Sequence, residues 1–217
     1  MTFHANDFIE FMLSCEVLKF GEFVTKSGRL SPYFVNTAGF KTGSQISRLA
    51  GFYAEKIKQT VGANFGALFG PAYKGIPLAA SVAAKLFEEH GIDKPYFFNR
   101  KEEKDHGEGG SLVGYKPKNG DSIIIIEDVI TAGTAIREVM PVLAKSADVS
   151  VKGMFISVNR CEVGNDLKTS AAQQIYQEFG ITVHSIIDFF DIYNYVKENL
   201  PEHISAMDNY KRQFVVK

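Results

Sequence analysis

The sequence is poor in several features that point to particular classes of protein. It has only two cysteines among its 217 residues, Cys15 and Cys161, and no C-x-x-C pair. Two cysteines are too few for a disulfide framework, so reduced thiols in a cytoplasmic protein are expected. No apolar run approaches membrane-spanning length, and no basic segment followed by an apolar stretch opens the chain. These absences favour a soluble intracellular protein.

The chain also has no large excess of positive or negative charge. The formal net charge is −1, which gives no indication of a nucleic-acid or membrane partner. What the chain does have is an apolar content of 45%, enough for a sizeable core. At this length, with no repeat, low-complexity tract or linker, residues 1–217 are expected to form a single α/β domain, with room for a small appendage.

One stretch stands out as the centre of the expected fold. Ile123–Ile126 has no polar alternation, which is typical of a strand buried on both faces in a parallel sheet. Glu127 and Asp128 follow, then the small residues 131–134, and from Ala135 apolar residues recur at helical spacing. A strand, a tight loop and a helix N-terminus together make an anion site, because unpaired N–H groups point at one place.

Two sequence features that the loop lacks limit which anion it could bind. It has neither the lysine of a nucleoside-triphosphate loop nor the G-x-G-x-x-G of a dinucleotide fold. Glu127 and Asp128 would repel a lone phosphate but suit a phosphate carried on a ribose, whose hydroxyls donate to carboxylates. The alternative is an ordinary strand–helix turn with solvated acids and Thr134 as N-cap.

Two further loops favour a second anion, each with a plainer alternative. After a strand at residues 65–69, the loop Gly70–Gly75 offers exposed amides and Lys74, although it could be a simple strand–helix connection. The charged, glycine-containing residues 101–111 form a long loop without core residues, which is usually functional or disordered. Such a loop could close as a lid over developing negative charge.

The remaining elements follow from periodicity and turn residues. We expect helices at residues 6–19, 45–61, 76–90, 135–145 and 167–179, and two more after Asp188, separated by Pro201. We expect strands at residues 96–100, 149–158 and 181–187, and a hairpin at 22–36 that turns at Ser27 and Gly28. His184 alternates within an apolar strand and is interpreted as structural.

The stretch Ile124–Ala135 resembles the phosphoribosyl-pyrophosphate (PRPP) signature of the type I phosphoribosyltransferases, which is four apolar residues, two acids and a T-x-G-T-like loop. The resemblance spans nearly the whole chain. It implies a mostly parallel central sheet flanked by helices, with a small hood subdomain mainly from about residues 1–40 and a C-terminal contribution. It also implies Mg²⁺ carried by PRPP without direct protein ligands, a homodimer with shared active sites, and no nucleic-acid or membrane partner.

A second segment indicates which nucleobase would receive the phosphoribosyl group. Residues 26–36 are similar to the K-S-G-R-x-S-P-Y-F-x-N stretch of the branch of the family that uses orotate. In that branch the lysine and the aromatic pair bind PRPP and orotate; here Phe34-Val35 stands where many members have Phe-Phe, so a ring stacking on the base would be lost. Arg160 follows a strand, where the family places an orotate-binding arginine, although a surface arginine is the commoner case. A guanidinium suits the carboxylate of orotate.

The resemblance implies transfer of the 5-phosphoribosyl group from PRPP to orotate, giving orotidine 5′-monophosphate and pyrophosphate in pyrimidine biosynthesis. It assigns catalysis to Lys104, His106 and Asp128. It assigns orotate binding to Lys26, Phe34, Val35, Thr131 and Arg160. It assigns PRPP binding to Lys26, Tyr73, Lys74, Arg100, Lys101, Lys104, His106, Glu127, Asp128, Val129, Ile130, Thr131, Ala132, Gly133, Thr134 and Ala135.

Two alternatives remain at this point. One is a phosphoribosyltransferase for another base, a purine or uracil, against which the Lys26 segment and Arg160 argue. The other is a non-catalytic, PRPP-sensing regulator of gene expression, which would be expected to lack the lid residues or to gain a nucleic-acid-binding surface. Lys101, Lys104 and His106 are present, and the net charge is −1.

Overall fold

A six-stranded sheet forms the centre of the computed structural model, which describes residues 4–25, 28–102, 111–130, 133–164 and 168–216. The strand order is β5-β4-β3-β6-β7-β8, and all neighbours pair in parallel except β4 and β5, which are antiparallel. The strands are β3 (Ala67–Gly70), β4 (Tyr96–Asn99), β5 (Leu112–Gly114), β6 (Ser122–Ile126), β7 (Ser150–Asn159) and β8 (Val183–Asp188).

The isoleucine run occupies the position that its pattern predicts. All four isoleucines of β6 are 0% exposed. Because successive side chains of a strand point to opposite faces, Ile124 and Ile126 belong to one apolar cluster and Ile123 and Ile125 to the other. The prediction of a strand buried on both faces is therefore confirmed.

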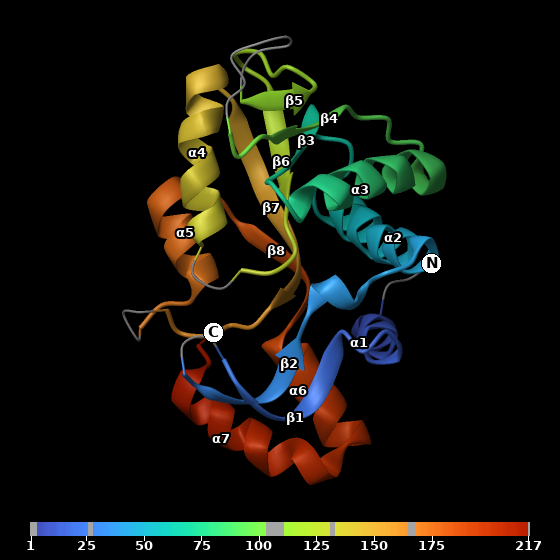
Figure 1. Cartoon of the computed structure of the whole chain (residues 1–217), viewed down its shortest axis with the longest axis vertical. Coiled ribbons are helices and arrows are strands. Elements are labelled where there is room, and N and C mark those ends of the chain that lie inside the picture. Colours follow the sequence, from blue (N-terminus) through green and yellow to red (C-terminus); the bar gives the residue numbers. More distant parts are fainter. Residues whose placement is uncertain (1–3, 26–27, 103–110, 131–132, 165–167, 217) are drawn as a thin grey trace.

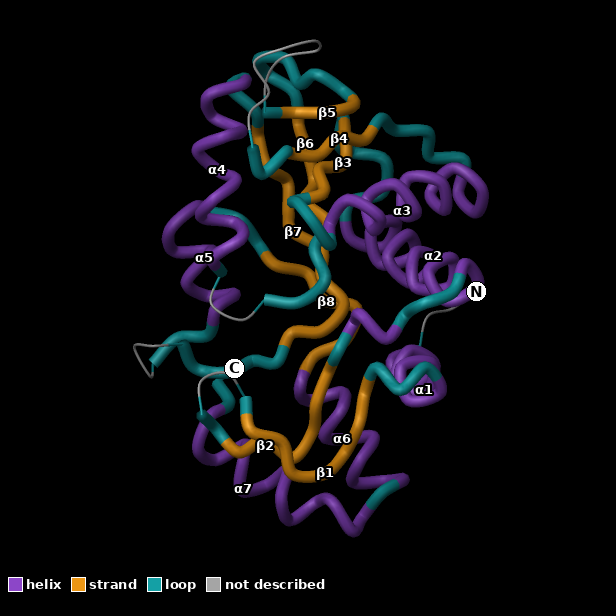
Figure 2. The backbone as a smooth tube through the Cα atoms, viewed as in Figure 1, coloured by secondary structure: helices purple, strands orange, loops and turns teal. Residues whose placement is uncertain are grey.

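Two pairs of helices cover the two faces of the sheet (Figures 1 and 2). On one side lie α2 (Gly43–Thr60) and α3 (Gly75–His90), whose buried residues share a cluster with Ile124 and Ile126. On the other lie α4 (Thr134–Ser146) and α5 (Ala171–Phe179), which pack with Ile123 and Ile125. Among the described residues, no helix combines the length and apolar character needed to cross a membrane.

A second, two-stranded antiparallel sheet, β1 (Leu18–Val24) and β2 (Leu30–Val35), stands at one end of the molecule. Figures 1 and 2 show it beside helices from both ends of the chain. These are α1 (Ala5–Ser14), α6 (Phe189–Asn199) and α7 (Ile204–Phe214), with the short turns η1 (Thr37–Gly39) and η2 (Pro201–His203). Tyr33 of β2 packs against the rings of Phe189 and Tyr210. The expected architecture, a mostly parallel central sheet flanked by helices with a small hood sheet, is thus confirmed.

Three boundaries differ from expectation by four residues or more: the end of the first helix, the start of β1, which is Leu18 and not Glu22, and the start of α5. One strand was not foreseen. The first helix ends at Ser14, not at Lys19, because Glu16 takes a left-handed conformation (φ 56°) and the N–H of Val17 donates to the carbonyl of Met12, which closes the helix. The chain is then free to enter β1 at Leu18. The helix expected from Leu167 begins at Ala171, where Ser170 provides an N-terminal cap. β5 follows the long loop and was too short to recognise.

Candidate active site

The candidate site lies at the carboxyl edge of the large sheet. Since β3, β6 and β7 run parallel, the segments that follow them leave the sheet at the same edge. These segments carry Tyr73 and Lys74, then Glu127 and Asp128, then Arg160. The topology therefore brings together three of the loops that the sequence singles out.

Asp128 is held by groups from three parts of the chain. Its Oδ2 accepts a hydrogen bond from Lys74 Nζ at 2.6 Å and one from Thr37 Oγ1 at 2.7 Å, while its Oδ1 accepts from the N–H of Val129. Burial by itself would raise the pKa of this carboxyl, but the hydrogen bonds from Lys74 and Thr37 outweigh it and lower the pKa below its usual value. Asp128 therefore remains ionised.

Glu127 behaves differently although it is the adjacent residue. It is 7% exposed, and its Oε1 accepts from the backbone N–H of Asp128 at 2.9 Å. Burial is the main cause that raises its pKa far above the usual value, and the negative charge of Asp128 adds to the effect. The two carboxyl groups therefore differ in protonation: Asp128 carries the negative charge, and Glu127 retains its proton more readily.

Two buried hydroxyls fix the backbone of this acidic pair. Tyr53 donates from its hydroxyl to the carbonyl of Glu127 at 2.7 Å, and Ser157 donates to the carbonyl of Asp128 at 2.6 Å. The Ser157 N–H donates to the same carbonyl at 2.8 Å. Sequence reasoning missed Tyr53, Ser157 and Thr37, because each acts through a partner distant in the sequence.

The strand–helix loop after Asp128 is described only in part. Gly133, with φ 69°, precedes the first residue of α4, Thr134, and being glycine it contributes no side-chain cap to the first N–H groups of the helix. Val129 forms a bridge with Val158. Thr131 and Ala132 lie outside the described residues, so their assignment stays a prediction.

The loop Gly70–Gly75 is tightly fixed on the neighbouring strands. A Cβ added to Gly70 would lie 2.2 Å from the carbonyl oxygen of Gly75, and one added to Gly75 would lie 2.9 Å from the carbonyl oxygen of Ile126. The buried side chain of Asn99 accepts from the N–H of Ala72 at 2.9 Å. This packing presents Tyr73, which is 71% exposed, at the surface beside Lys74.

The long loop is described only at its two ends. The N–H of Arg100 donates to the carbonyl of Ser111 at 2.7 Å. Lys101 forms an ion pair with Glu138 of α4 at 2.8 Å. Lys104 and His106 lie outside the described residues, as does Lys26 of the hood hairpin, so the structure neither supports nor opposes their assignment.

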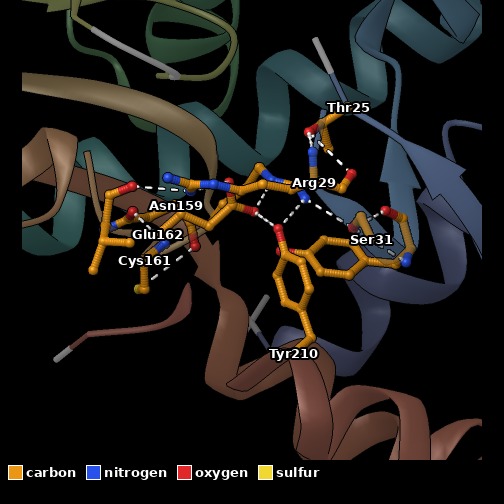
Figure 3. Close-up of polar contacts among 10 residues, drawn as sticks. Thr25, Arg29, Ser31, Asn159, Cys161, Glu162 and Tyr210 are labelled. Atoms are coloured by element: carbon orange, nitrogen blue, oxygen red, sulfur yellow. Dashed lines mark hydrogen bonds and ion pairs between the residues drawn. The ribbon is translucent and has the colours of Figure 1, made fainter. Parts of the chain in front are cut away.

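Arg160 lies in a network between the sheet and the hood, with a side chain that is 12% exposed. Its Nε donates to Glu162 at 2.5 Å, and its Nη2 donates to Ser31 at 3.0 Å and to Tyr210 at 3.3 Å (Figure 3). Burial disfavours its charge, but Tyr33, Glu162 and Tyr210 more than compensate, so its pKa is raised. The neighbouring Cys161 is a buried thiol whose pKa is raised by burial to about 11.

The two hood residues assigned to the base are neighbours in β2. Phe34 is 42% exposed and stacks on Phe23 of β1 with ring centroids 5.4 Å apart. Val35 is partly buried against the core and pairs with Leu18. The aromatic surface of the hairpin is therefore formed by Phe34 and Phe23, from two strands, and not by a consecutive pair of rings.

A cavity of about 190 Å³ adjoins the acidic pair. Thr37, Lys74 and Asp128 form its polar wall, and apolar side chains such as Phe40 and Leu49 line the rest. A larger cavity, of about 650 Å³, extends from Asp93 to Gly114 beside β4 and β5, away from the acidic pair. Of these two cavities, the smaller one adjoins the carboxylate.

Comparison with known proteins establishes the class. The family model for the phosphoribosyl transferase domain matches residues 39–162. This segment contains β3, β6, the acidic pair and the whole of α4. The fold and the site thus define a type I phosphoribosyltransferase.

Full-length relatives identify the member of that class. The orotate phosphoribosyltransferase of Pseudomonas fluorescens (strain SBW25) is 49% identical over 218 residues, covering 100% of both chains. That of Clostridium acetobutylicum is 47% identical, covering 96% of this chain and 93% of its own. The crystal structure of the Francisella tularensis enzyme matches with a TM-score of 0.88 and 42% identity, covering 97% of this chain and 100% of that one. The chain belongs to the orotate phosphoribosyltransferases.

This membership decides between the alternatives left open by the sequence. The chain is an enzyme of pyrimidine biosynthesis that joins the phosphoribosyl group of PRPP to orotate, and not a regulator or a transferase for another base. The family generally uses Mg²⁺. The roles of individual residues are a separate question.

Proposed function

We propose that the reaction takes place at the carboxyl edge of β3, β6 and β7, with PRPP across the acidic pair and orotate between Arg160 and the hood. The observation that carries this arrangement is the environment of Asp128. An ionised carboxylate beside a lysine and an adjoining cavity offers both an acceptor for hydroxyls and a cation for phosphate.

In this proposal Lys74 exchanges partners when PRPP binds. In the free site Lys74 Nζ donates to Asp128 at 2.6 Å. The ribose hydroxyls of PRPP would take over the carboxylate, which releases Lys74 toward the pyrophosphate oxygens. The lysine head group can make this move because its side chain is 59% exposed. The exchange keeps the Asp128 oxygens hydrogen-bonded throughout.

The 5′-phosphate is assigned to the loop and helix start at residues 131–135, and Val129 and Ile130 before them are assigned to PRPP more generally. Support comes from the position of Gly133 directly before α4, where the first N–H groups of the helix and the positive end of its dipole favour an anion. Such a site holds the phosphate without a lysine in the loop.

The leaving pyrophosphate is assigned to Tyr73, Lys74, Arg100, Lys101, Lys104 and His106. Lys74 and Lys101 approach from different elements, the β3–α3 loop and the end of β4. Orotate can attack as its anion, so no strong general base is required. Positioning and electrostatic stabilisation of the leaving group then provide most of the rate enhancement, with the ionised Asp128 facing the positive charge that builds on the ribose and Glu127 beside it.

Orotate is assigned to Lys26, Phe34, Val35, Thr131 and Arg160. Arg160 follows β7 of the large sheet and donates to Ser31 and Tyr210 of the hood, which supports a base site at that junction. Backbone groups of Phe34 and Val35 would contact the ring, so the valine is tolerated where a second phenylalanine is common. The carboxylate of orotate then pairs with the arginine.

Mg²⁺ is proposed to enter with PRPP. Among the described residues no group of three or more histidine, cysteine, aspartate or glutamate side chains can hold a metal ion. Mg²⁺ often takes most of its ligands from substrate phosphates, with one or two carboxylates and water. An ion held by the oxygens of PRPP needs no direct protein ligand, and it would neutralise pyrophosphate charge at the site.

The functional unit is proposed to be a cytoplasmic homodimer with shared active sites. In each subunit, residues 1–217 form one domain, and segments from both ends of the chain form its hood. Support for the hood comes from the packing of α6 and α7 against α1 and β2. Two free cysteines are consistent with a reducing compartment.

The proposal is tested by mixing the purified protein with PRPP, Mg²⁺ and orotate and following the loss of orotate absorbance, with uracil and hypoxanthine in parallel. Consumption of orotate alone is expected. Consumption of uracil or hypoxanthine at a comparable rate would contradict the proposed base site, and PRPP binding without consumption of any base would contradict the catalytic assignment.

Replacing Lys104 with alanine is expected to lower kcat about 30-fold, the loss of one charge-assisted hydrogen bond of about 2 kcal/mol to the leaving group. The melting temperature should stay within about 1 °C of wild type, because the sequence predicts that Lys104 belongs to a long loop without core residues, where substitutions have small effects. Steady-state kinetics measures kcat, and thermal unfolding measures the melting temperature. Lys152→Ala, at an exposed position of β7, is the control; an unchanged kcat for Lys104→Ala would remove this lysine from the mechanism.

A further inference from the structure

The hydrogen bonds around Arg160 occupy one side of its guanidinium group. Glu162 Oε1 accepts from Arg160 Nε at 2.5 Å and from the hydroxyl of Tyr210 at 2.5 Å, and that hydroxyl in turn accepts from Arg160 Nη2 at 3.3 Å. These three bonds close a ring of polar contacts. Ser31 of β2 takes a further bond from Nη2 at 3.0 Å. Figure 3 shows Ser31, Glu162 and Tyr210 converging from separate segments of the chain.

The remaining nitrogen of the guanidinium, Nη1, makes no hydrogen bond with the described parts of the chain. An arginine has five N–H donors in a rigid plane. Because Nε and Nη2 are engaged, Nη1 is the donor left for a ligand. The face of the same group lies on the ring of Tyr33, with Cζ 4.3 Å from the ring centroid. The plane of the guanidinium is therefore fixed by a ring below it and acceptors along one edge.

The C-terminal segment holds the backbone that carries this network. The N–H of Val163 donates to the carbonyl of Phe214 at 2.8 Å, and the N–H of Val216 donates to the carbonyl of Cys161 at 2.8 Å. Arg29 donates to the carbonyl of Val163 at 3.0 Å and lies over the ring of Phe214. Residues 160–163 are thus paired with the end of the chain, in addition to the side-chain contact with Tyr210.

We propose that Tyr210, acting with Glu162, is a positioning residue for base recognition: the pair sets the plane of the Arg160 guanidinium and leaves Nη1 for the carboxylate of orotate. The inference rests on the proposed contact between Arg160 and orotate. Long arginine side chains lose rotamer freedom when they bind, and fixing the side chain beforehand removes that cost from the binding step. Tyr210 therefore acts on affinity for the base and not on the chemical step.

Glu162 has a second consequence for the same site. A buried arginine without a counter-charge is strongly destabilising, so the carboxylate allows Arg160 to stay buried before orotate arrives. Glu162 also lies 3.9 Å from Arg29, which means that it is shared between two guanidinium groups. Removing Glu162 would disturb folding as well as binding. Tyr210 is the cleaner residue to change.

The test is Tyr210→Phe, which keeps the ring and removes only the hydroxyl. The KM for orotate is expected to rise about 10-fold, while kcat and the KM for PRPP change by less than about 2-fold, as for loss of an interaction present equally in the bound and transition states. Tyr193→Phe is the matched control, because Tyr193 also donates to a carboxylate, that of Asp208 at 2.7 Å, between α6 and α7. It should leave the KM for orotate unchanged.

A double-mutant cycle with Arg160→Lys shows whether Tyr210 acts through Arg160. Arg160→Lys keeps the charge beside Glu162 but cannot reproduce the planar set of donors, so the KM for orotate should rise. Adding Tyr210→Phe to that variant should then raise it less than about 2-fold further. A full, independent effect of Tyr210→Phe in both backgrounds would overturn the positioning role.

The two proposals fail in different ways. An unchanged KM for orotate in Arg160→Lys would reject the contact between Arg160 and orotate, and the positioning role with it. A raised KM in Arg160→Lys but not in Tyr210→Phe would reject the positioning role alone. Equal losses of kcat and of affinity for both substrates in Tyr210→Phe, accompanied by a lower melting temperature, would identify a purely structural residue.

Discussion

Replacing Asp128 with asparagine is expected to lower kcat/KM for PRPP on the order of 10³-fold. Two ribose hydroxyls would each lose a charge-assisted hydrogen bond of about 2 kcal/mol, and about 4 kcal/mol corresponds to that factor. The change keeps the shape of the side chain and one oxygen acceptor for Thr37. What disappears is the negative charge that faces the ribose.

The same substitution should lower the melting temperature by only a few degrees at most. In the ion pair the Asp128 side chain is 9% exposed but that of Lys74 is 59% exposed, so solvent screens the pair on the lysine side and its contribution is on the order of 1 kcal/mol. Asp128→Asn is therefore expected to lower activity strongly and stability only slightly. Initial rates at varied PRPP concentration and thermal unfolding followed by circular dichroism provide the two measurements.

Asp121→Asn is the matched control. Asp121 precedes β6 at the opposite edge of the sheet, and its Oδ2, like that of Asp128, accepts two hydrogen bonds, from the hydroxyl of Tyr115 and from the N–H of Lys118, both at 2.8 Å. Its kcat/KM should remain within about 2-fold of wild type, since only groups near the reacting atoms stabilise the transition state. A loss of less than about 5-fold in Asp128→Asn would reject the assignment of this carboxylate to the ribose.

Adding one methyl group at Gly70 is expected to destabilise the fold by at least about 3 kcal/mol. The new Cβ would lie 2.2 Å from the carbonyl oxygen and 2.7 Å from the carbonyl carbon of Gly75, and 2.8 Å from the Cβ of Ala79. Backbone atoms cannot turn away as a flexible side chain can. The start of α3 would have to move from the sheet, and Lys74 with it.

For a chain of this size, that loss corresponds to a fall of about 6–12 °C in the melting temperature. Gly43→Ala is the control, because a Cβ there meets nothing within 4 Å and the residue opens α2. Its melting temperature should equal or slightly exceed that of wild type. A Gly70→Ala protein that melts within about 2 °C of wild type would show that the loop is not held as tightly as its contacts indicate.

The parts of the fold with a strong local pattern could be predicted from the sequence. The isoleucine run gave β6, and apolar spacing gave α2 and α3 to within two residues. The end of α1 was wrong because it depends on Glu16 in a left-handed conformation, which is uncommon for a residue other than glycine. β5 has only three residues and exists because β4 offers it an antiparallel partner.

The candidate site was predictable to the extent that parallel strands place their following loops together. This rule located Lys74, the acidic pair and Arg160 at one edge. The rule could not predict the hydrogen bond between Lys74 and Asp128, which are 54 positions apart in the sequence. Nor could it predict the buried hydroxyls that donate to the backbone of the acidic pair. Lys26, Lys104, His106, Thr131 and Ala132 lie outside the described residues, and their roles stay predictions.

The hood sheet has a consequence for the way this chain acquires its structure. Its strands lie within the first 35 residues, yet the helices that cover it, α6 and α7, begin at Phe189 and Ile204. Tyr33 is completely buried against Phe189 and Tyr210. During synthesis from the N-terminus, the first segment must therefore wait until nearly the whole chain has been made before its apolar side chains are covered. Such contacts between distant segments slow folding and leave apolar surface open to aggregation or to chaperones in the meantime.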